Sequence, residues 1–351
     1  MRIVVTGASG NVGTAVVRAL SGDERVGAIA GIARREPESR VPKLRWVTAD
    51  LGGDDPDALD AVMAGADAVI HLAWLFQPAR DPLVTWRTNV LGSIRVFEAV
   101  ARNSVPALIH ASSVGAYSPG PKDRPVDETW PTHGWPAAAY TREKAYVERA
   151  LDAFEARHPD VRVVRMRPAF LFQYGSASEQ RRLFAGPLLP NRLVRPEVIP
   201  VVPDLPGLHV QVLHTDDAAS AYRLAVLGDA RGAFNLAADP VVDAGLLAEL
   251  LDARVVRMPV WPVRAAVVAA WRLHLAPAAP ELFDAVLRMP VMDTSRARAE
   301  LGWTPRHGAA EVMAEFLAGL REGAGLPTPP LTPEVPGGRL GELATGAGGK
   351  P

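Results

Sequence analysis

The sequence predicts an α/β fold in which a doubly wound parallel sheet is followed by a smaller, mostly helical C-terminal lobe. The first observation is a glycine-rich turn between a β-branched run at residues 2–5 and a helical run at residues 14–20. The second is an alternation of strand-like and helix-like segments up to residue 167, which is typical of a parallel sheet covered on both faces. The third is the loss of that alternation after Pro168.

The strand-like runs are short and apolar, as expected for strands buried on both sides. After the first, they lie at residues 27–33, 44–48, 68–73, 107–112 and 161–167. Helical spacing is found between them at residues 56–64, 84–102 and 140–157. Residues 208–238 predict a return to the sheet, with a strand at 209–213, a helix at 216–227 and a strand at 233–236.

This order predicts two units and a tail. A Rossmann-type dinucleotide-binding domain is expected from residues 1–171 together with 208–238. A substrate-binding lobe is expected from residues 172–207 together with 239–325, where prolines punctuate helical segments. Residues 326–351 are rich in Pro, Gly and Thr, and we expect a disordered tail because they lack the apolar content to fold.

The turn at residues 6–13 suits the diphosphate of a dinucleotide. Gly7 permits a tight turn, Gly10 lets the backbone approach phosphates, and Gly13 lets the helix lie close to the strand. The following helix offers free N–H groups and a partial positive charge to an anion. The alternative is a glycine turn without a ligand. The loop residues expected to contact the cofactor are Gly7, Ser9, Gly10, Asn11, Val12 and Gly13.

A tyrosine and a lysine one helical turn apart are candidates for acid/base chemistry. Tyr140 and Lys144 share a helix face, and a nearby ammonium favours the phenolate, which lowers the phenol pKa from about 10. The spacing alone is weak, because it often marks a solvated helix face. It gains weight from Ser112 and Ser113, which follow the fifth strand at the sheet edge where ligands bind.

The composition limits the classes of function. The formal net charge is −1 and no charge run stands out, so neither nucleic acid nor an anionic membrane surface is indicated as a partner. The absence of cysteine excludes disulfides and thiol catalysis. No apolar run approaches the roughly 18 residues of a membrane span, and no cluster has convincing metal spacing. With its first strand at residue 2 leaving no room for a signal peptide, we expect a cytoplasmic protein that acts on a small molecule.

These motifs, taken together, resemble those of the extended short-chain dehydrogenases/reductases. That branch includes nucleotide-sugar epimerases and dehydratases, 3β-hydroxysteroid dehydrogenases and dihydroflavonol-type ketone reductases. The likeness covers about residues 1–320 and is specific for the family, but it says much less about the substrate. Besides the glycine loop, Ser113, Tyr140 and Lys144, it rests on Asp50-Leu51, His71-Leu72-Ala73, Asn89, Arg167-Pro168, the residues 214–217, 234–236 and 293–295, and the Leu-Gly-Trp-Thr-Pro run at 301–305.

The resemblance implies catalytic roles for four residues. Tyr140 would give or take a proton at the substrate oxygen, and Ser113 would hydrogen-bond the same oxygen, with Ser112 as the alternative. Lys144 would hold the nicotinamide ribose and depress the pKa of Tyr140. Asn89 would support the active-site helix or a proton-relay water, although it could instead be a helix cap.

The same resemblance implies further cofactor contacts. Asp50 and Leu51 would flank the adenine, Leu72 and Ala73 would line the cofactor, and Pro168 would lie near the carboxamide. Asp50 could instead be a turn residue. The two strand histidines, His71 and His110, are expected to be packed in the sheet rather than to bind metal.

The end of the second strand favours NADP(H) over NAD(H). NAD-dependent enzymes place an acidic residue there for the ribose 2′-hydroxyl, and the matching positions here are the uncharged Gly31 and Ala33. Arg34 and Arg35 follow at once, and a guanidinium suits a phosphate. The alternative is that both arginines are solvated loop charges.

Departures from the family pattern bear on the substrate. The arginine that grips the pyrophosphate in many nucleotide-sugar enzymes is replaced by Val210, and the Asp-Glu pair of the 4,6-dehydratases is replaced by Val114-Gly115. Four arginines could substitute for the missing one: Arg181, Arg182, Arg192 and Arg195. The aromatic residues expected on the substrate side are Trp74, Phe76, Trp86, Trp130, Trp135, Phe170, Phe172, Trp261 and Trp271, the last two within an apolar helix over the cleft at 259–275.

The sequence therefore favours an NAD(P)-dependent oxidoreductase that interconverts a ketone and a secondary alcohol on an apolar, ring-containing molecule. The alternative is a nucleotide-sugar epimerase that re-uses its bound NAD. A cofactor-binding regulator without turnover is disfavoured by the intact set of Ser113, Tyr140 and Lys144. The resemblance also suggests a homodimer formed through the helices at 84–102 and 140–157.

Overall fold

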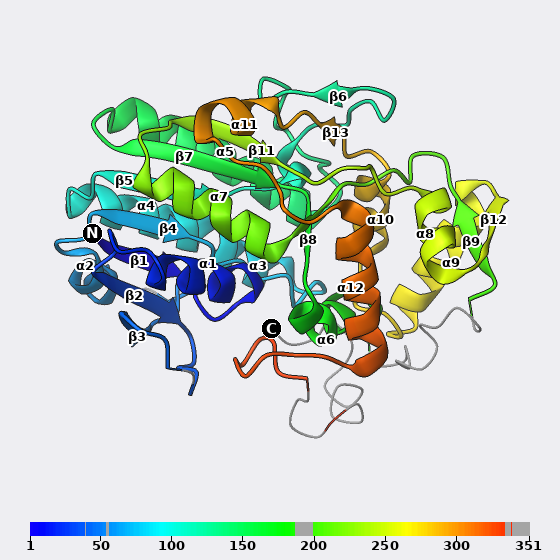
Figure 1. Cartoon of the computed structure of the whole chain (residues 1–351), viewed down its shortest axis with the longest axis horizontal. Helices are drawn as coiled ribbons and strands as arrows, with labels where there is room; N and C mark the ends of the chain where they lie inside the picture. The colour runs from blue at the N-terminus through cyan, green and yellow to red at the C-terminus, as the bar shows by residue number, and fades with distance from the viewer. Residues whose placement is uncertain (39, 54–55, 187–198, 334–337, 339–351) are drawn as a thin grey trace.

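The computed structural model describes the chain except for residues 39, 54–55, 187–198, 334–337 and 339–351 (Figure 1). A central sheet has the strand order β11-β7-β5-β4-β1-β2-β3. Every neighbouring pair in it is parallel, which confirms the predicted fold class. Its strands are β1 (Arg2–Thr6), β2 (Ala28–Ala33), β3 (Leu44–Thr48), β4 (Ala68–His71), β5 (Ala107–Ala111), β7 (Arg162–Pro168) and β11 (Gly232–Leu236).

Helices cover both faces of this sheet. On one face, α1 (Asn11–Ser21) and α7 (Thr215–Leu227) lie side by side and share a core with β1, β4 and β7 (Figure 1). The other face is covered by α2 (Pro56–Met63), α4 (Gly92–Arg102) and α5 (Ala139–Arg157). The strands are buried on both sides for this reason, which explains why they are continuous apolar runs rather than alternating ones.

The helix predicted at 84–102 is three segments. It begins earlier, at α3 (Pro82–Trp86), because the Asp81 side chain accepts the Leu83 N–H and Pro82 occupies the first turn. A π-helical stretch, Arg87–Leu91, then joins α3 to α4. This stretch includes Asn89, so the irregular turn sits beside the candidate site.

Small paired strands connect the sheet to the rest of the chain. The strand predicted at 209–213 is β10 (Val212–His214), which pairs with β8 (Phe170–Phe172) outside the central sheet. Another pair joins β6 (Pro125–Val126) to β13 (Val291–Met292), and a third joins β9 (Val201–Asp204) to β12 (Arg254–Arg257). Short helical segments follow β5 and β8: the 3₁₀ turns Val114–Ala116 and Tyr174–Ser176, α6 (Ala177–Gln180) and the π-helical Arg181–Ala185.

The remaining helices lie beyond β11. They are α8 (Ala244–Leu251), α9 (Val260–Arg272), α10 (Pro280–Val286), α11 (Ser295–Leu301) and α12 (Ala309–Glu322). In Figure 1, α8, α9, β9 and β12 lie together at the right of the sheet, and we call this part the smaller lobe. In contrast, α11 contacts β11 and α7, and Leu301 and Trp303 join the sheet's own core. The segment after β13 is thus shared between the two units.

Residues 326–333, the first part of the predicted disordered tail, make hydrogen bonds with one another and with Arg182. The Leu326 N–H donates to the Leu331 carbonyl oxygen, and the Leu331 side chain is fully buried. Arg182 donates to the carbonyl oxygens of Thr332 and Pro330. A few leucines and one arginine therefore order a Pro- and Thr-rich stretch. The rest of the predicted tail, apart from residue 338, lies outside the described residues.

Among the described helices, none combines the length and the apolar character needed to cross a membrane.

Candidate active site

The glycine-rich loop lies at the carboxyl end of the parallel strands, between β1 and α1. Gly7 has a φ of +68°, and a Cβ there would meet the Ala73 nitrogen at 2.7 Å. A Cβ at Gly13 would lie 2.1 Å from the Gly7 carbonyl oxygen, so the loop and the first turn of α1 touch backbone to backbone. A Cβ at Gly10 would meet the Gly7 carbonyl oxygen at 3.4 Å, an ordinary contact distance, so the space at Gly10 is less restricted than at Gly7 or Gly13.

This arrangement fits a dinucleotide. The α1 N-terminus follows β1, which pairs with β4 in the sheet. From β1 the strand order continues to β2 on one side and from β4 to β5 on the other, so the two strands flank the switch point of this topology. Asn11 is held there, because its Oδ1 accepts from Gln173 Nε2 at 2.6 Å and from Thr215 Oγ1 at 3.2 Å. Ser9 is buried and Val12 is partly buried in the same loop.

The other residues expected at the cofactor follow the ends of four strands. Arg34 and Arg35 are exposed directly after β2. Beyond β3, Asp50 is exposed and accepts the Gly52 N–H at 2.9 Å, as the turn interpretation also predicts, while Leu51 is buried. Beyond β4, Leu72 donates to the Thr6 carbonyl and Ala73 to Thr6 Oγ1. Pro168 is buried at the end of β7.

The two candidate serines point to different partners. The Tyr140 hydroxyl donates to Ser113 Oγ at 2.8 Å, and Ser113 Oγ also accepts the Gly115 N–H. Ser112 Oγ donates instead to Glu148 Oε1 at 2.5 Å. Consecutive side chains of an extended strand end face opposite ways, so only Ser113 is available to a ligand of Tyr140.

Lys144 does not direct its ammonium at the phenol. Its Nζ donates to the Ala111 carbonyl oxygen at 2.7 Å and lies 3.4 Å from the centroid of the Trp74 ring. Burial lowers the pKa of Lys144 to about 7, against the opposing effect of Glu148 and Glu143. Burial raises the pKa of Tyr140 to about 12, and the bond to Ser113 only partly opposes this. The predicted depression of the Tyr140 pKa is therefore wrong for the protein chain by itself.

Asn89 connects the active-site helix to the segment after β4. Its Oδ1 accepts the Leu75 N–H at 2.7 Å, and its Nδ2 donates to the Leu75 carbonyl oxygen at 2.8 Å and to Glu143 Oε2 at 2.7 Å. Of the two roles implied for Asn89, this geometry matches support of the helix.

Glu143 is a buried carboxyl that the sequence reasoning missed. Thr85 donates to its Oε1 at 2.7 Å, and burial raises its pKa despite the bonds from Asn89 and Thr85. The available signal was an acidic residue directly before Lys144 on a helix whose neighbouring positions are buried. Because Asn89 binds both Glu143 and Leu75, this carboxyl helps to fix the segment from Trp74 to Phe76 beside Tyr140.

A second buried network lies beneath Ser112. Glu148 is fully buried and accepts from Arg165 at 3.0 Å and from Arg167 at 2.9 Å. Burial alone would raise the pKa of Glu148, but Arg167 and Arg165 outweigh it and lower the pKa to about 2. This network anchors α5 to β7.

The strand histidines are buried, as predicted. His71 bonds Thr6 Oγ1 at 2.7 Å and Ser93 Oγ at 2.8 Å, and burial lowers its pKa to about 3. His110 has no hydrogen-bond partner on either ring nitrogen among the described residues, and burial lowers its pKa well below the usual value. Within the described part of the chain, no group of three or more His, Asp or Glu side chains could hold a metal ion.

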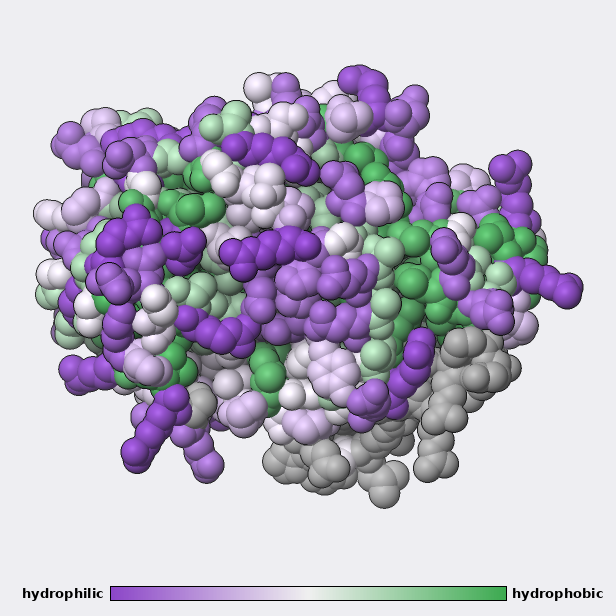
Figure 2. Space-filling view, viewed as in Figure 1, coloured by the Kyte–Doolittle hydropathy of each residue, from purple (hydrophilic) through white to green (hydrophobic). Residues whose placement is uncertain are grey.

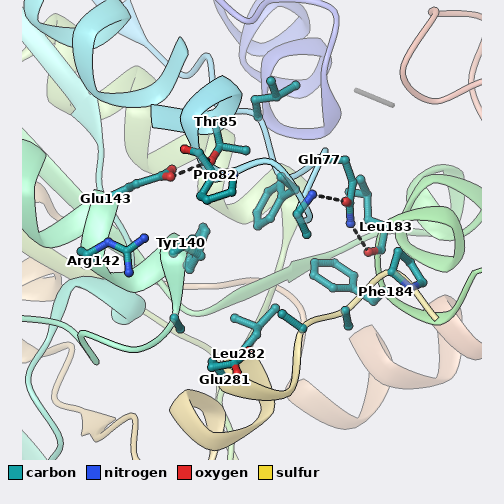
Figure 3. Close-up of a pocket in the computed structure, with 18 of the residues that line it drawn as sticks. Gln77, Pro82, Thr85, Tyr140, Arg142, Glu143, Leu183, Phe184, Glu281 and Leu282 are labelled. Atoms are coloured by element: carbon teal, nitrogen blue, oxygen red, sulfur yellow. Dashed lines mark hydrogen bonds between the residues drawn. The ribbon is translucent and has the colours of Figure 1, made fainter. Parts of the chain in front are cut away.

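A cavity of about 210 Å³ adjoins Tyr140 between the sheet domain and the smaller lobe. Figure 3 shows Tyr140, Glu143 and Thr85 on one side of it and Gln77, Leu183 and Phe184 on another. Of the aromatic residues predicted on the substrate side, Trp74, Phe76 and Trp271 line this cavity.

The other predicted aromatic residues do not line the cavity. Trp130, Trp135 and Phe170 pack in a separate core cluster instead, and the Trp261 side chain is 72% exposed. Trp86 contacts Tyr146, and Phe172 stacks on Phe316.

The described arginines proposed as pyrophosphate ligands are engaged elsewhere. Arg181 donates to the Gly186 carbonyl oxygen at 2.9 Å and is buried, and Arg182 holds the 326–333 segment as described above. Val210 pairs with Val242 through two backbone hydrogen bonds. Arg192 and Arg195 lie outside the described residues.

Comparisons with known proteins agree with this geometry. The model of the family described as "NAD dependent epimerase/dehydratase family" matches residues 3–237. A dTDP-glucose 4,6-dehydratase of Streptomyces niveus is 26% identical over 361 residues, covering 97% of this chain and 99% of that protein. An uncharacterized protein of Mycobacterium tuberculosis is 24% identical over 333 residues, covering 90% of this chain and 83% of that protein. A solved UDP-glucose-4-epimerase from Stenotrophomonas maltophila with bound NAD has a similar fold, with a TM-score of 0.68 at 21% identity over 92% of this chain and 98% of that one.

Proposed function

Because the chain belongs to the NAD dependent epimerase/dehydratase family, we propose that it is an NAD(P)-dependent oxidoreductase that interconverts a ketone and a secondary alcohol. Its substrate is an apolar small molecule rather than a nucleotide sugar. Tyr140 is the acid/base, and Ser113 hydrogen-bonds the same substrate oxygen. The nicotinamide, when bound, supplies or accepts the hydride.

The geometry of Ser113 and Tyr140 supports this chemistry. Two hydroxyls 2.8 Å apart can both reach one carbonyl oxygen, which polarises the carbonyl and orients it. With a pKa raised to about 12, Tyr140 keeps its proton at neutral pH, so the protein by itself is prepared to donate a proton to the oxygen of a ketone. The Lys144 Nζ, held by Ala111, lies one helical turn away, and its protonated form adds a positive charge there.

The character of the cavity wall is the observation that carries the choice of substrate. Most of the lining side chains are aromatic or aliphatic, and the charged ones are Arg142, Glu143 and Glu281. A pyrophosphate brings two negative charges, and burying them beside two acidic residues with one arginine is unfavourable. That arginine also donates to the Pro136 carbonyl oxygen at 2.9 Å. An apolar ring, in contrast, gains about 25 cal/mol for each Å² that it buries on such a wall.

The second candidate is a nucleotide-sugar epimerase that re-uses tightly bound NAD. It is favoured by the likeness in fold to the epimerase from Stenotrophomonas maltophila over 92% of this chain. Dehydration is disfavoured, because Val114 and Gly115 follow Ser113 where an acid pair would be needed.

Two measurements on the purified protein separate these functions. We expect NAD(P)H absorbance to fall when aryl and alicyclic ketones are added, and the Tyr140→Phe variant to lose this activity. Calorimetric titration with UDP-, dTDP- and GDP-sugars should give no heat of binding. Micromolar binding of a nucleotide sugar together with no ketone turned over would establish the epimerase instead.

We also propose a homodimer formed through α3, α4 and α5. This face carries exposed apolar side chains, with Leu83 77%, Leu91 40% and Tyr146 48% exposed. Burying them against a second copy would remove apolar surface from water. Sedimentation equilibrium should give twice the mass of one chain, and Tyr146→Glu should shift it toward the monomer. A wild-type monomer at micromolar concentration would contradict the proposal.

A further inference from the structure

Arg80 and Trp271 join the two halves of the molecule at the cavity. Arg80 follows β4 in the sheet domain, and Trp271 is in the last turn of α9 in the smaller lobe. The guanidinium carbon of Arg80 lies 3.7 Å from the centroid of the Trp271 ring, as in a cation–π contact. Arg80 Nη2 also donates to the Trp271 carbonyl oxygen. One side chain thus fixes both the ring and the backbone of this tryptophan.

Trp271 also lines the cavity that holds Tyr140. Since the guanidinium covers one face of the indole, the surface that Trp271 offers to the cavity is its other face or its edge. None of the residues of α9 is buried, and among the described elements α10 is its main packing partner. The position of the Trp271 ring therefore depends on Arg80.

The other aromatic side chains of the cavity are already paired. Phe76 stacks on Tyr140 with centroids 5.1 Å apart and meets Phe184 edge-on at 5.6 Å. Trp74 meets the ring of Tyr140 edge-on and covers the ammonium of Lys144. In the described part of the chain, Trp271 makes no ring contact with another aromatic residue, which leaves it as the aromatic surface open to a ligand.

We infer that Trp271 is the surface on which the ring of the substrate stacks, and that Arg80 is the positioning residue that holds the indole in place. This inference rests on the proposed function and deepens it. Its substrate is a ketone, or the matching secondary alcohol, that carries an uncharged aromatic ring remote from the reacting carbon. The carbonyl then lies at Tyr140 and Ser113 while the ring lies at the wall formed by α9. Offset or edge-to-face contact with an indole favours such a ring over a saturated one of equal size.

The test compares matched substrates on matched variants. Steady-state kinetics are measured with a phenyl-substituted ketone and its cyclohexyl analogue, using Trp271→Ala, Trp271→Phe, Arg80→Gln and Arg80→Lys. Trp261→Ala is the control, because Trp261 belongs to the same helix but is 72% exposed and does not line the cavity. Thermal unfolding of each variant checks that it is folded.

We expect Trp271→Ala to raise KM for the phenyl ketone about tenfold with kcat changed much less, and to affect the cyclohexyl analogue only slightly. Trp271→Phe should retain most of the affinity. Arg80→Gln should raise KM in the same direction, and Arg80→Lys should restore part of it, because an ammonium can still lie on the indole. Trp261→Ala should behave as wild type.

A binding readout is independent of turnover. Titrating the wild-type protein with the phenyl ketone should quench tryptophan fluorescence, and Trp271→Phe should lose this change while Trp261→Phe keeps it. If Trp271→Ala leaves the KM for the phenyl ketone and the quenching unchanged, the stacking role is overturned while the ketone reductase stands. If Arg80→Gln matches wild type, the positioning role of Arg80 is overturned. A wild-type protein that turns over no ketone overturns the proposed function itself.

Discussion

Two helices of similar composition, α1 and α9, are packed in opposite ways. Both are rich in valine and alanine and contain no acidic residue. In α1, five residues are buried against the sheet and α7, whereas α9 has no buried residue at all. The apolar side chains of α1 form part of the main core, but those of α9 border a cavity and the surface.

The difference in packing indicates that the sheet domain and the smaller lobe have different roles. The first turn of α1 tolerates no extra atom at Gly13, where it meets the glycine-rich loop, so the part of the site that would meet the cofactor is closely packed. In the smaller lobe, Val255, Val256 and Trp261 are exposed. Figure 2 shows hydrophobic residues gathered on the surface of this lobe, with hydrophilic residues between them. Residues in the substrate wall of this lobe can be substituted without disturbing the packing of the sheet. The predictions below test whether chemistry and stability reside in the sheet domain and specificity in the lobe.

The largest effect is expected at Tyr140. Tyr140→Phe removes only the hydroxyl that bonds Ser113, and loss of one acid/base group commonly costs about 100- to 10,000-fold in turnover. Cofactor affinity should be nearly unchanged, whereas Lys144→Ala should reduce both. Ser113→Ala should also lower kcat strongly, measured against Ser112→Ala as the neighbouring control. If Tyr140→Phe keeps more than about a tenth of the wild-type rate, another group is the acid.

Glu148→Gln is expected to have the next largest effect, on folding. Removing one partner of a buried ion network costs about 3–5 kcal/mol of unfolding free energy. The folded-state pKa of Glu148, about 2, lies below its ordinary value of 4.5. The stability it contributes is therefore complete above about pH 4.5 and is lost as the pH falls toward 2.

The control for Glu148 is an ion pair of the smaller lobe. Arg264 and Asp284 join α9 to α10 at 2.8 Å, with the arginine 45% exposed, so Asp284→Asn should cost about 1 kcal/mol or less. Urea unfolding at pH 7 and pH 3 measures both variants. If Glu148→Gln and Asp284→Asn lose the same unfolding free energy at pH 7, the sheet domain and the smaller lobe do not differ in how strongly their ion pairs stabilise the fold.

The buried histidines predict an acid-sensitive sheet. Burial lowers the pKa values of His71 and His110 in the folded state. Below about pH 6.5 these histidines are therefore protonated in the unfolded chain but stay neutral in the folded one. Stability is thus complete above that pH and decreases by about 1.4 kcal/mol per unit and per histidine below it. His110→Met should reduce the slope of unfolding free energy between pH 6.5 and 5, measured by urea unfolding at several pH values. An unchanged slope in His110→Met would show that His110 does not titrate on unfolding.

Most of the sheet domain could be predicted from the sequence, because local patterns determine it. Apolar runs bounded by turns located the strands of the central sheet to within a residue or two, and the strand-to-helix glycine spacing located the loop. The π-helical stretch around Asn89 was missed, since a local widening of a helix leaves no periodic signal. The run at 301–305 does not predict that Trp303 is buried beside Asp217, because that contact depends on a segment that returns to the sheet late in the chain.

The chemistry of the site was less predictable, since it depends on where side chains point. The sequence correctly places Tyr140 and Lys144 one turn apart on the same helix. The Lys144 ammonium nevertheless points to Ala111 and Trp74, so burial has the larger effect on the pKa of the Tyr140 phenol and raises it. Composition suggested an aromatic substrate side, but only tertiary packing shows which rings line the cavity. Arg80 carried no local signal, because its partner lies 191 positions away.

The preference for NADPH over NADH is expected to depend on the exposed residues that follow β2. Arg34 and Arg35 are exposed after β2, so they can reach a 2′-phosphate without rearranging the core. We expect NADPH to bind at least about tenfold more tightly than NADH. Arg35→Ala or Arg34→Ala should reduce this difference in affinity between the two cofactors. Arg45→Ala, at an exposed position on β3, serves as the control in the same fluorescence titrations. Equal or tighter binding of NADH by the wild-type protein would contradict the preference.

The smallest effect is expected on the outward side of α9. Trp261 is 72% exposed, so Trp261→Ala gives up little buried surface and should change the unfolding free energy by less than about 0.5 kcal/mol. The matched change in the sheet domain is Val16→Ala in α1, where the side chain is fully buried, and it should cost about 1–3 kcal/mol. Urea unfolding of both variants measures the contrast directly. A loss above 1 kcal/mol for Trp261→Ala would mean that the outward side of α9 is covered in solution, and the lobe would then be as firmly packed as the sheet.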